Sequence, residues 1–221
     1  MSQSLRLLFV GGSTMKGHSV LGQIDSYAQQ LARNPHYEAT IIVKDRILIS
    51  EVLDIVEKSQ DFDVLVIQVG VSDSLLRRFK VRKNSYPKNY FPYQRQAMTK
   101  RLLKQLLYFA RVSRSRTKSS AYYLCIEKIS AVASVNGVRI IWLGSIIAPI
   151  RLMKIETKIK NLYCKYYFKD IAGRMPKNHV FIDVDEICSN FVDEFDVFHL
   201  NQAGHNLLSG LVEERLDNWH I

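Results

Sequence analysis

The sequence predicts an α/β fold: a three-layer α/β/α sandwich in which a central, mostly parallel five-stranded sheet lies between two layers of helices. Two observations lead to this prediction. Short β-branched apolar runs alternate with longer amphipathic segments along the chain, the order that parallel sheets require. The chain has 221 residues, 47% of them hydrophobic, which suits one domain with a full core. We therefore expect a single domain over residues 1–221.

The expected elements alternate in order. Apolar runs bounded by turn residues predict strands at residues 5–10, 38–43, 64–69, 138–143 and 179–183. Amphipathic stretches predict helices at residues 21–34, 49–59, 100–108, 121–136, 155–174 and 200–216. In the first helix, Ile24, Tyr27 and Leu31 would share one stripe. Parallel strands end at one edge of a sheet, and ligands bind beyond that edge.

Residues suited to nucleophilic catalysis fall at this edge. Ser13 follows the first strand and two glycines, whereas Asp196 precedes His199 by three residues near the end of the chain. A serine hydroxyl needs an imidazole to take its proton, and a carboxylate must then orient the imidazole. Ser13, His199 and Asp196 therefore predict a site for acyl transfer, provided that the fold brings the two segments together.

Three segments resemble sequence blocks of the SGNH, or GDSL-like, hydrolases. Gly11-Gly12-Ser13 resembles the first block, a strand followed by Gly-Asp-Ser. Gly70-Val71-Ser72-Asp73 resembles the third block, Gly-x-Asn-Asp, and Asp196-x-x-His199 matches the fifth. The chain is identified as a divergent member, similar to those associated with bacterial surface-polysaccharide genes. The resemblance implies a flavodoxin-like sandwich and a Ser-His-Asp triad that needs neither a cofactor nor a metal.

The resemblance also implies an altered oxyanion hole. In the family, the hole is formed by the serine N–H, a second-block glycine N–H and the third-block asparagine side chain. Here Ser72 replaces the asparagine, and residues 44–48 contain no glycine, so backbone near Arg46 would take the second role. Loss of one oxyanion donor typically costs roughly 100- to 1000-fold in rate. The expected oxyanion and substrate-binding residues are Gly12, Arg46, Gly70, Ser72, Asp73 and Arg77, the last as a contact for an acidic sugar or phosphate.

The activity implied by the resemblance is that of a serine esterase. Its substrate would be an O-acylated, typically acetylated, carbohydrate or glycan precursor of polysaccharide biosynthesis. Two alternatives stay open. The same site becomes an O-acyltransferase of a polysaccharide pathway if a sugar hydroxyl replaces water. A catalytically weakened glycan- or polyanion-binding protein would keep the fold and the basic surface but would need no triad.

A basic, aromatic insertion is expected at about residues 74–120. No acidic residue lies between Asp73 and Glu127, and fourteen of the 31 Lys and Arg residues lie from Arg77 to Lys118. Such a segment attracts polyanions, so an anionic glycan substrate is the favoured partner and a membrane surface an alternative. Nucleic acid is less favoured, although basic and aromatic residues also suit single strands. Alternatively, the segment is a solvated lid that binds no anionic partner. The oligomeric state is left open.

Cysteine usage and hydropathy favour a cytoplasmic location. Cys125, Cys164 and Cys188 are widely spaced and odd in number, which fits neither a disulfide framework nor a metal site. The first residues lack the pattern of a secretory signal. No apolar run approaches the roughly 18 residues that a membrane-spanning helix needs.

Overall fold

The computed structural model describes residues 4–19, 22–59, 61–69, 73, 117, 119–144, 171–177, 179–188, 190–191 and 199–219. Within these residues five strands form one sheet in the order β4-β1-β5-β6-β7, and every pairing in it is parallel. The strands are β1 (Leu5–Gly11), β4 (Tyr37–Val43), β5 (Val64–Gln68), β6 (Arg139–Leu143) and β7 (Val180–Ile182). The expected fold class is confirmed.

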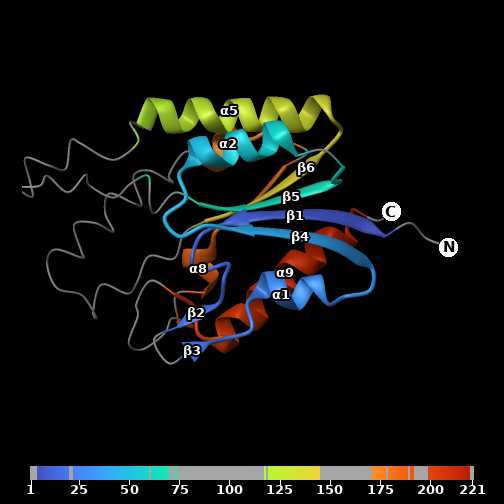
Figure 1. The fold of residues 1–221 in the computed structure, drawn as a ribbon, viewed down its shortest axis with the longest axis vertical. Coiled ribbons are helices and arrows are strands. Elements are labelled where there is room, and N and C mark those ends of the chain that lie inside the picture. The colour runs from blue at the N-terminus through green and yellow to red at the C-terminus, as the bar shows by residue number, and fades with distance from the viewer. Residues whose placement is uncertain are drawn as a thin grey trace, which may run out of the picture.

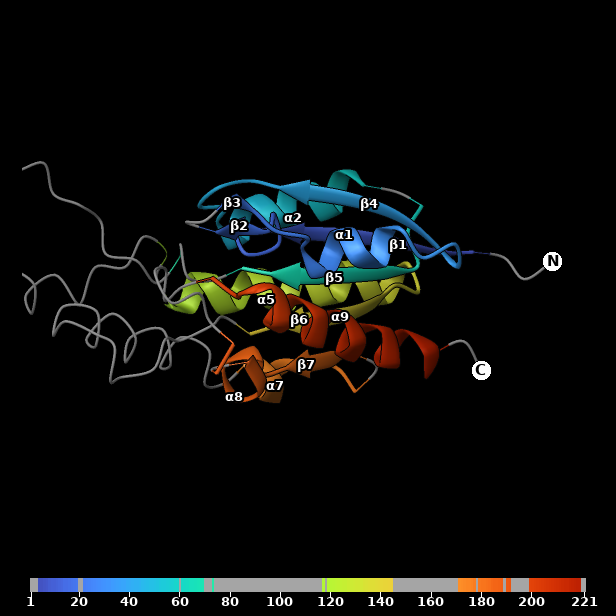
Figure 2. The same ribbon diagram turned by 90° about the horizontal axis from the view of Figure 1, so that it is seen from below.

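Helices cover both faces of this sheet. Helices α2 (Ile49–Lys58) and α5 (Ser119–Val135) lie on one face, and α1 (Tyr27–Ala32) and α9 (Gln202–Asp217) on the other (Figure 1). The view from below shows α1 and α9 side by side across the sheet (Figure 2). Strand β5 is buried along its whole length because it is covered on both faces.

Successive residues of the strands supply two separate cores. One core, on the side of α2 and α5, takes Leu8 and Val10 from β1. The other, on the side of α1 and α9, takes Leu7 and Phe9. This alternation follows from the two-residue period of a strand. It decides which β1 side chains face each layer of helices.

The first predicted helix begins later than expected. Two short strands, β2 (His18–Ser19) and β3 (Gly22–Gln23), pair in antiparallel fashion, and α1 begins only at Tyr27. The helix begins there because Ser26 Oγ accepts the Gln29 N–H and Gln29 Oε1 accepts the Ser26 N–H, at 3.2 and 3.1 Å. This reciprocal arrangement is a capping box. The expectation that Ile24 belongs to the helical stripe was therefore wrong.

The other differences between the predicted and the observed elements concern the segments around β7 and the middle of the chain. Helix α8 (Val184–Cys188) follows β7 directly and was not predicted; Asp183 Oδ1 accepts the Glu186 N–H in its first turn. Of the helix expected at residues 155–174, only α7 (Ile171–Arg174) is described. The helix expected at residues 100–108 and nearly all of the basic insertion lie outside the described residues.

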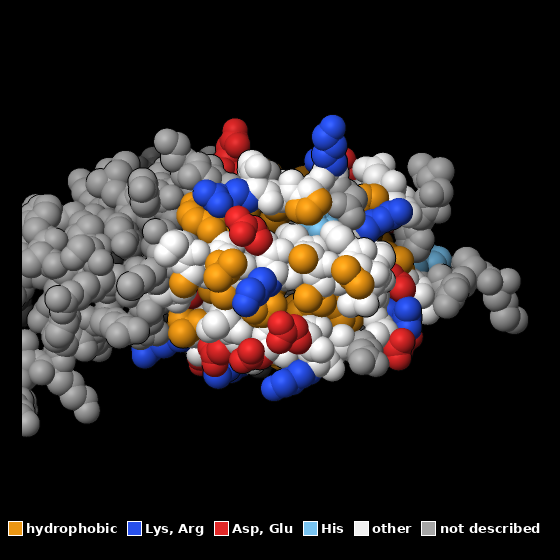
Figure 3. Space-filling model, turned by 90° about the horizontal axis from the view of Figure 1, so that it is seen from above, with side chains coloured by type: hydrophobic (Ala, Val, Ile, Leu, Met, Phe, Trp, Pro, Cys, Tyr) orange, Lys and Arg blue, Asp and Glu red, His pale blue; other side chains and the backbone are white. Residues whose placement is uncertain are grey.

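The face formed by α2 and α5 has a mixed surface. Acidic, basic and hydrophobic side chains are interspersed on it (Figure 3). Leu124 and Val135 of α5 are exposed hydrophobic side chains. Across the described part of the chain, no helix is both long and apolar enough to cross a membrane. The same residues contain no group of three or more His, Cys, Asp or Glu side chains that could hold a metal ion.

Candidate active site

Ser13 and His199 meet beyond the carboxyl end of β1. Ser13 opens the turn that follows this strand, and His199 lies just before α9. The His199 Nε2 and Ser13 Oγ atoms are 2.7 Å apart, although 186 positions separate the two residues. A neutral imidazole that carries its proton on Nδ1 would accept the serine proton in this arrangement.

The turn that presents Ser13 depends on close packing beneath it. The Ser13 and Thr14 carbonyls accept the N–H groups of Lys16 and Gly17, both at 3.2 Å. Met15 is fully buried under the turn. A Cβ atom on Gly11 would lie 2.9 Å from the Met15 Sδ and Cε atoms, so glycine at position 11 makes room for this methionine. The serine is therefore presented by a turn that is anchored in the core.

The Gly12 position is open. Apart from its chain neighbours, no heavy atom of the described residues lies within 4 Å of a Cβ atom built on Gly12. A Cβ atom at this position would therefore meet none of the described residues. Glycine at position 12 is not required by packing, in contrast to Gly11.

Gly17 ends the turn and joins it to the segment before α1. Its φ is +73°, and a Cβ atom there would lie 2.2 Å from the Ile24 carbonyl oxygen. Glycine reaches this left-handed conformation readily, whereas other residues do so at a cost. The Gly17 carbonyl accepts the Ile24 N–H at 3.0 Å. The backbones at Gly17 and Ile24 are thus in direct contact, which leaves no room for a side chain at position 17.

The loop after β4 packs against the end of β1. The Gly11 carbonyl accepts the Lys44 N–H at 3.0 Å, and Ile47 returns to the core. Between them, Arg46 has a φ of +60°, a left-handed conformation that favours glycine, and its side chain is exposed. A backbone conformation that favours glycine is therefore present at Arg46, although the residue is not glycine. The role of the Arg46 N–H as an oxyanion donor remains a prediction.

Asp73 is buried and faces the first turn of α2. Its carboxylate accepts the Ile49 N–H at 3.1 Å and the Thr117 hydroxyl, and its carbonyl accepts the Thr117 N–H at 3.3 Å. Burial raises the pKa of Asp73 to about 6, and the hydrogen bonds from Thr117 and Ile49 oppose this rise. These contacts cap α2. The expected contact of Asp73 with substrate stays a prediction.

A buried polar network, absent from the sequence predictions, lies behind the candidate nucleophile. The Tyr27 hydroxyl donates to Gln68 Oε1 at 3.0 Å, and Gln68 is paired with Gly11 in the sheet. The Tyr27 N–H donates to His205 Nδ1 at 3.4 Å, and the two rings stack. Burial, followed by the nearby His199, lowers the pKa of His205 to about 4, while Asp25 opposes the shift. His205 therefore packs against Tyr27 in the core.

Four expected site residues lie outside the described residues: Asp196, Gly70, Ser72 and Arg77. Their roles as the orienting carboxylate, as parts of the oxyanion hole and as an anion contact stay predictions.

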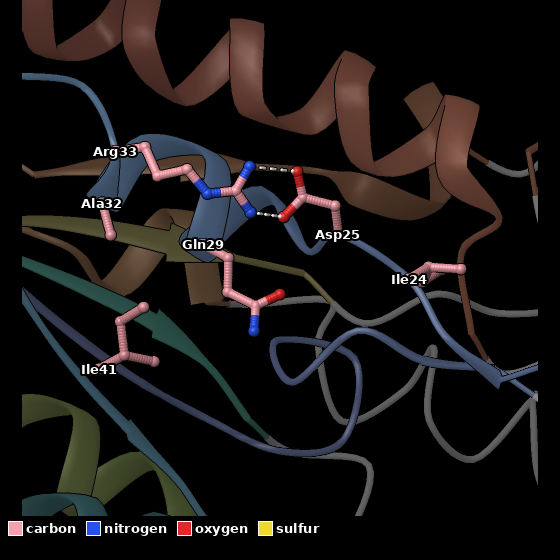
Figure 4. Close-up of a pocket in the computed structure, with 6 residues that line it drawn as sticks. All are labelled: Ile24, Asp25, Gln29, Ala32, Arg33 and Ile41. Atoms are coloured by element: carbon pink, nitrogen blue, oxygen red, sulfur yellow. Dashed lines mark hydrogen bonds and ion pairs between the residues drawn. The ribbon is translucent and has the colours of Figure 1, made fainter.

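A hollow of about 560 Å³ lies beside the segment that leads into α1. It is lined by Ile24, Asp25, Gln29, Ala32, Arg33 and Ile41. Asp25, Gln29 and Arg33 form one wall of the hollow, and Ile41 of β4 lies opposite (Figure 4). The Arg33 guanidinium donates to both carboxylate oxygens of Asp25. The two charged side chains that line the hollow, Asp25 and Arg33, are therefore already paired with each other.

Comparison with solved structures agrees with the fold described above. An acetylxylan esterase from Geobacillus stearothermophilus aligns over 95% of this chain and 93% of its own, with a TM-score of 0.54 and 16% identity. A GDSL-like lipase from Bacteroides thetaiotaomicron aligns over 96% and 88%, with a TM-score of 0.53 and 12% identity. An α/β hydrolase from the metagenome of Lake Arreo aligns over 94% and 93%, with a TM-score of 0.53 and 11% identity.

These similarities establish that the chain has the fold of the SGNH, or GDSL-like, hydrolases. No family model matches the sequence, and no curated protein matches it either. For the acetylxylan esterase, structures exist of catalytic mutants in which a serine, an aspartate or a histidine is replaced by alanine.

Proposed function

We propose that this protein is a serine esterase that removes an acyl group from an O-acylated carbohydrate. The observation that carries the proposal is the 2.7 Å contact between His199 Nε2 and Ser13 Oγ at the carboxyl edge of a parallel sheet. A serine paired with an imidazole at this edge is the arrangement needed to activate a hydroxyl nucleophile.

In the proposed reaction, Ser13 Oγ attacks the ester carbonyl carbon while His199 Nε2 takes the serine proton. The tetrahedral intermediate collapses, and His199 delivers the proton to the departing sugar oxygen. The acyl group is then bound to Ser13 Oγ. Water attacks this acyl-enzyme, with His199 again as the base, and the free acid leaves. The reaction is balanced by water alone.

Asp196 is the proposed orienting carboxylate. In the acetylxylan esterase, the aspartate and histidine altered in the catalytic mutants are three positions apart, as Asp196 and His199 are here. A carboxylate bonded to the Nδ1 proton would fix the tautomer in which Nε2 faces Ser13. The spacing therefore supports a complete triad.

The proposed oxyanion hole combines backbone and side-chain donors. The N–H groups of Ser13 and Arg46 would supply two, and the Ser72 hydroxyl would replace the family's asparagine amide. The left-handed backbone at Arg46, held by the Lys44 bond to β1, supports the second donor. A shorter side-chain donor predicts a slower enzyme than the family pattern would give.

The proposed substrate class is an acetylated sugar. Support comes from the acetylxylan esterase among the structural neighbours and from the basic segment at about residues 74–120, which would favour an anionic glycan. Arg77 is the proposed contact for an acidic sugar or a phosphate.

Hydrolysis of p-nitrophenyl acetate tests the reaction, and release of acetate from acetylated xylo-oligosaccharides tests the substrate class. Ser13→Ala and His199→Ala should each reduce kcat at least about 1000-fold, because either change removes the activated hydroxyl. Ser134→Ala, an exposed serine of α5, is the matched control and should retain wild-type activity. Equal rates for wild type and Ser13→Ala would refute the esterase. Transfer of the acetyl group to an added sugar rather than to water would reassign the reaction to an O-acyltransferase.

A further inference from the structure

The segment that leads into α1 is fastened to the first turn of α9 by one side chain, that of Gln202. Its Oε1 accepts the Asp25 N–H at 3.1 Å, and its Nε2 donates to the Asp25 carbonyl at 3.0 Å. The Gln202 side-chain amide thus binds both the backbone N–H and the backbone carbonyl of Asp25. This pairing is specific in direction, because only an amide offers a donor and an acceptor at this spacing.

The Gln202 side chain is itself held in place. Its Nε2 also contacts Asn206 Oδ1, one turn further along α9, at 2.9 Å. Gln30 of α1 donates to both the Asp25 carbonyl and Asn206 Oδ1, at 2.9 and 3.0 Å. The exposed bonds therefore form a closed network rather than a single contact that water could replace at little cost.

This network connects the two residues of the proposed catalytic pair. On one side, Asp25 follows Ile24, whose N–H is bound by Gly17, the last residue of the turn that presents Ser13. On the other side, Gln202 lies three residues after His199 and begins α9. The bonds between Asp25 and Gln202 thus connect the turn that presents Ser13 with the segment that carries His199, although the two lie at opposite ends of the sequence.

We propose that Gln202 is a positioning residue that sets the distance between His199 and Ser13. The inference rests on the proposed esterase function, but it concerns residues that do not touch the reacting atoms. Removing the amide removes both direct bonds between Asp25 and the first turn of α9, and leaves the contacts that α1 itself makes with His205 and Asn206. The 2.7 Å contact between imidazole and hydroxyl then varies, and a displacement of about 1 Å can cost on the order of 100-fold in rate.

A merely structural role would have a different signature. Glu213 of α9 also bonds to the α1 side of the fold, since its Oε1 accepts from Asn34 Nδ2 at 2.7 Å. This bond lies near the opposite end of α9, away from His199. Glu213→Ala therefore removes one contact between the same two parts of the fold without touching the bonds between Asp25 and Gln202, and it serves as the matched control.

The test compares Gln202→Ala, Gln202→Glu and Glu213→Ala with wild type, using p-nitrophenyl acetate. Gln202→Ala should lower kcat about 10- to 100-fold and leave KM within about twofold. Gln202→Glu keeps the acceptor for the Asp25 N–H and places a carboxylate in the first turn of α9, where it favours the helix. It should give an intermediate kcat, because one of the two bonds to Asp25 is kept and the bond from Nε2 is lost. Glu213→Ala should retain wild-type kcat.

Equal kcat values for Gln202→Ala, Glu213→Ala and wild type would overturn the proposal. So would a loss of kcat in Gln202→Ala and Glu213→Ala alike, which would indicate a general structural effect. If wild type shows no Ser13-dependent hydrolysis, the esterase function fails, and amide hydrogen exchange over residues 199–205 decides the positioning role by itself. Faster exchange in Gln202→Ala but not in Glu213→Ala would support it, and unchanged exchange would refute it.

Discussion

Replacing Asp73 with asparagine should make the protein lose stability in mild acid over a range in which wild type changes little. Two buried groups, Asp73 and His205, respond to pH in opposite directions. The pKa of His205 is lowered from 6.5 to about 4, whereas the pKa of Asp73 is raised from 3.8 to about 6, each chiefly by burial. In both cases the folded protein disfavours the charged form.

The two contributions to the free energy of unfolding are similar in size. Because each pKa unit corresponds to about 1.4 kcal/mol, His205 lowers stability by about 3 kcal/mol as pH falls from 6.5 through 4. The unfolded state takes up the histidine proton first, so this stability is present above pH 6.5 and is lost below it. Asp73 raises stability by about 3 kcal/mol as pH falls from 6 to 3.8, since the folded state takes up the carboxylate proton first. In wild type the two slopes nearly cancel.

Asp73→Asn removes one slope and keeps an oxygen to accept the Ile49 N–H. Urea unfolding followed by tryptophan fluorescence should therefore show a loss of about 3 kcal/mol between about pH 7 and pH 4, relative to wild type. His205→Phe, which keeps a ring against Tyr27, should show a gain of similar size. Other acidic groups, such as Asp63 beside Arg6, titrate equally in all three proteins and cancel in the comparison. The same pH slope in Asp73→Asn and wild type would refute the reasoning.

Two further predictions concern backbone conformation near the candidate site. Gly17→Ala should lower the free energy of unfolding by at least about 2 kcal/mol, because its Cβ would lie 2.2 Å from the Ile24 carbonyl oxygen at a φ of +73°; a thermal melting temperature equal to that of wild type would contradict this. Arg46→Gly should raise the free energy of unfolding by up to about 1 kcal/mol, because glycine adopts a φ of +60° without strain. The same variant should hydrolyse p-nitrophenyl acetate within a few-fold of wild type, since the backbone N–H is kept, and a loss beyond about 100-fold would show that the guanidinium itself is required.

The regular part of the fold could be predicted because periodicity and burial agree there. The runs at residues 5–10, 64–69 and 138–143 are apolar except for one residue each, Arg6, Gln68 and Arg139, as suits strands covered on both faces, and all three lie in the centre of the sheet. The start of α1 could not be found from apolar spacing, because Ile24 falls in phase with Tyr27 and Leu31 by chance. The capping box of Ser26 and Gln29 carried the better signal.

Only some residues of the candidate site could be predicted from the sequence. Ser13 and His199 could be named because acyl transfer demands particular residue types at the ends of strands. Gln202 and Gln68 could not, because an amide has no spacing signature and its role depends on which backbone the fold brings near it. Asp25, the partner of Gln202, lies 177 positions away in the chain, and no local pattern can reveal such a pairing.

The departures of this chain from the family pattern affect the proposed oxyanion hole unequally. A backbone donor needs a conformation rather than a side chain, and the loop after β4 holds Arg46 in that conformation through the Lys44 bond to Gly11 and the buried Ile47. Strain of about 1 to 2 kcal/mol at such a residue persists only where the surroundings fix it. The missing glycine would therefore cost stability and leave the proposed donor, the Arg46 N–H, in the same conformation. The replacement of the family's asparagine by Ser72 changes the donor itself, so any deficit in rate should trace to position 72, and Ser72→Asn should recover activity that Arg46→Gly does not.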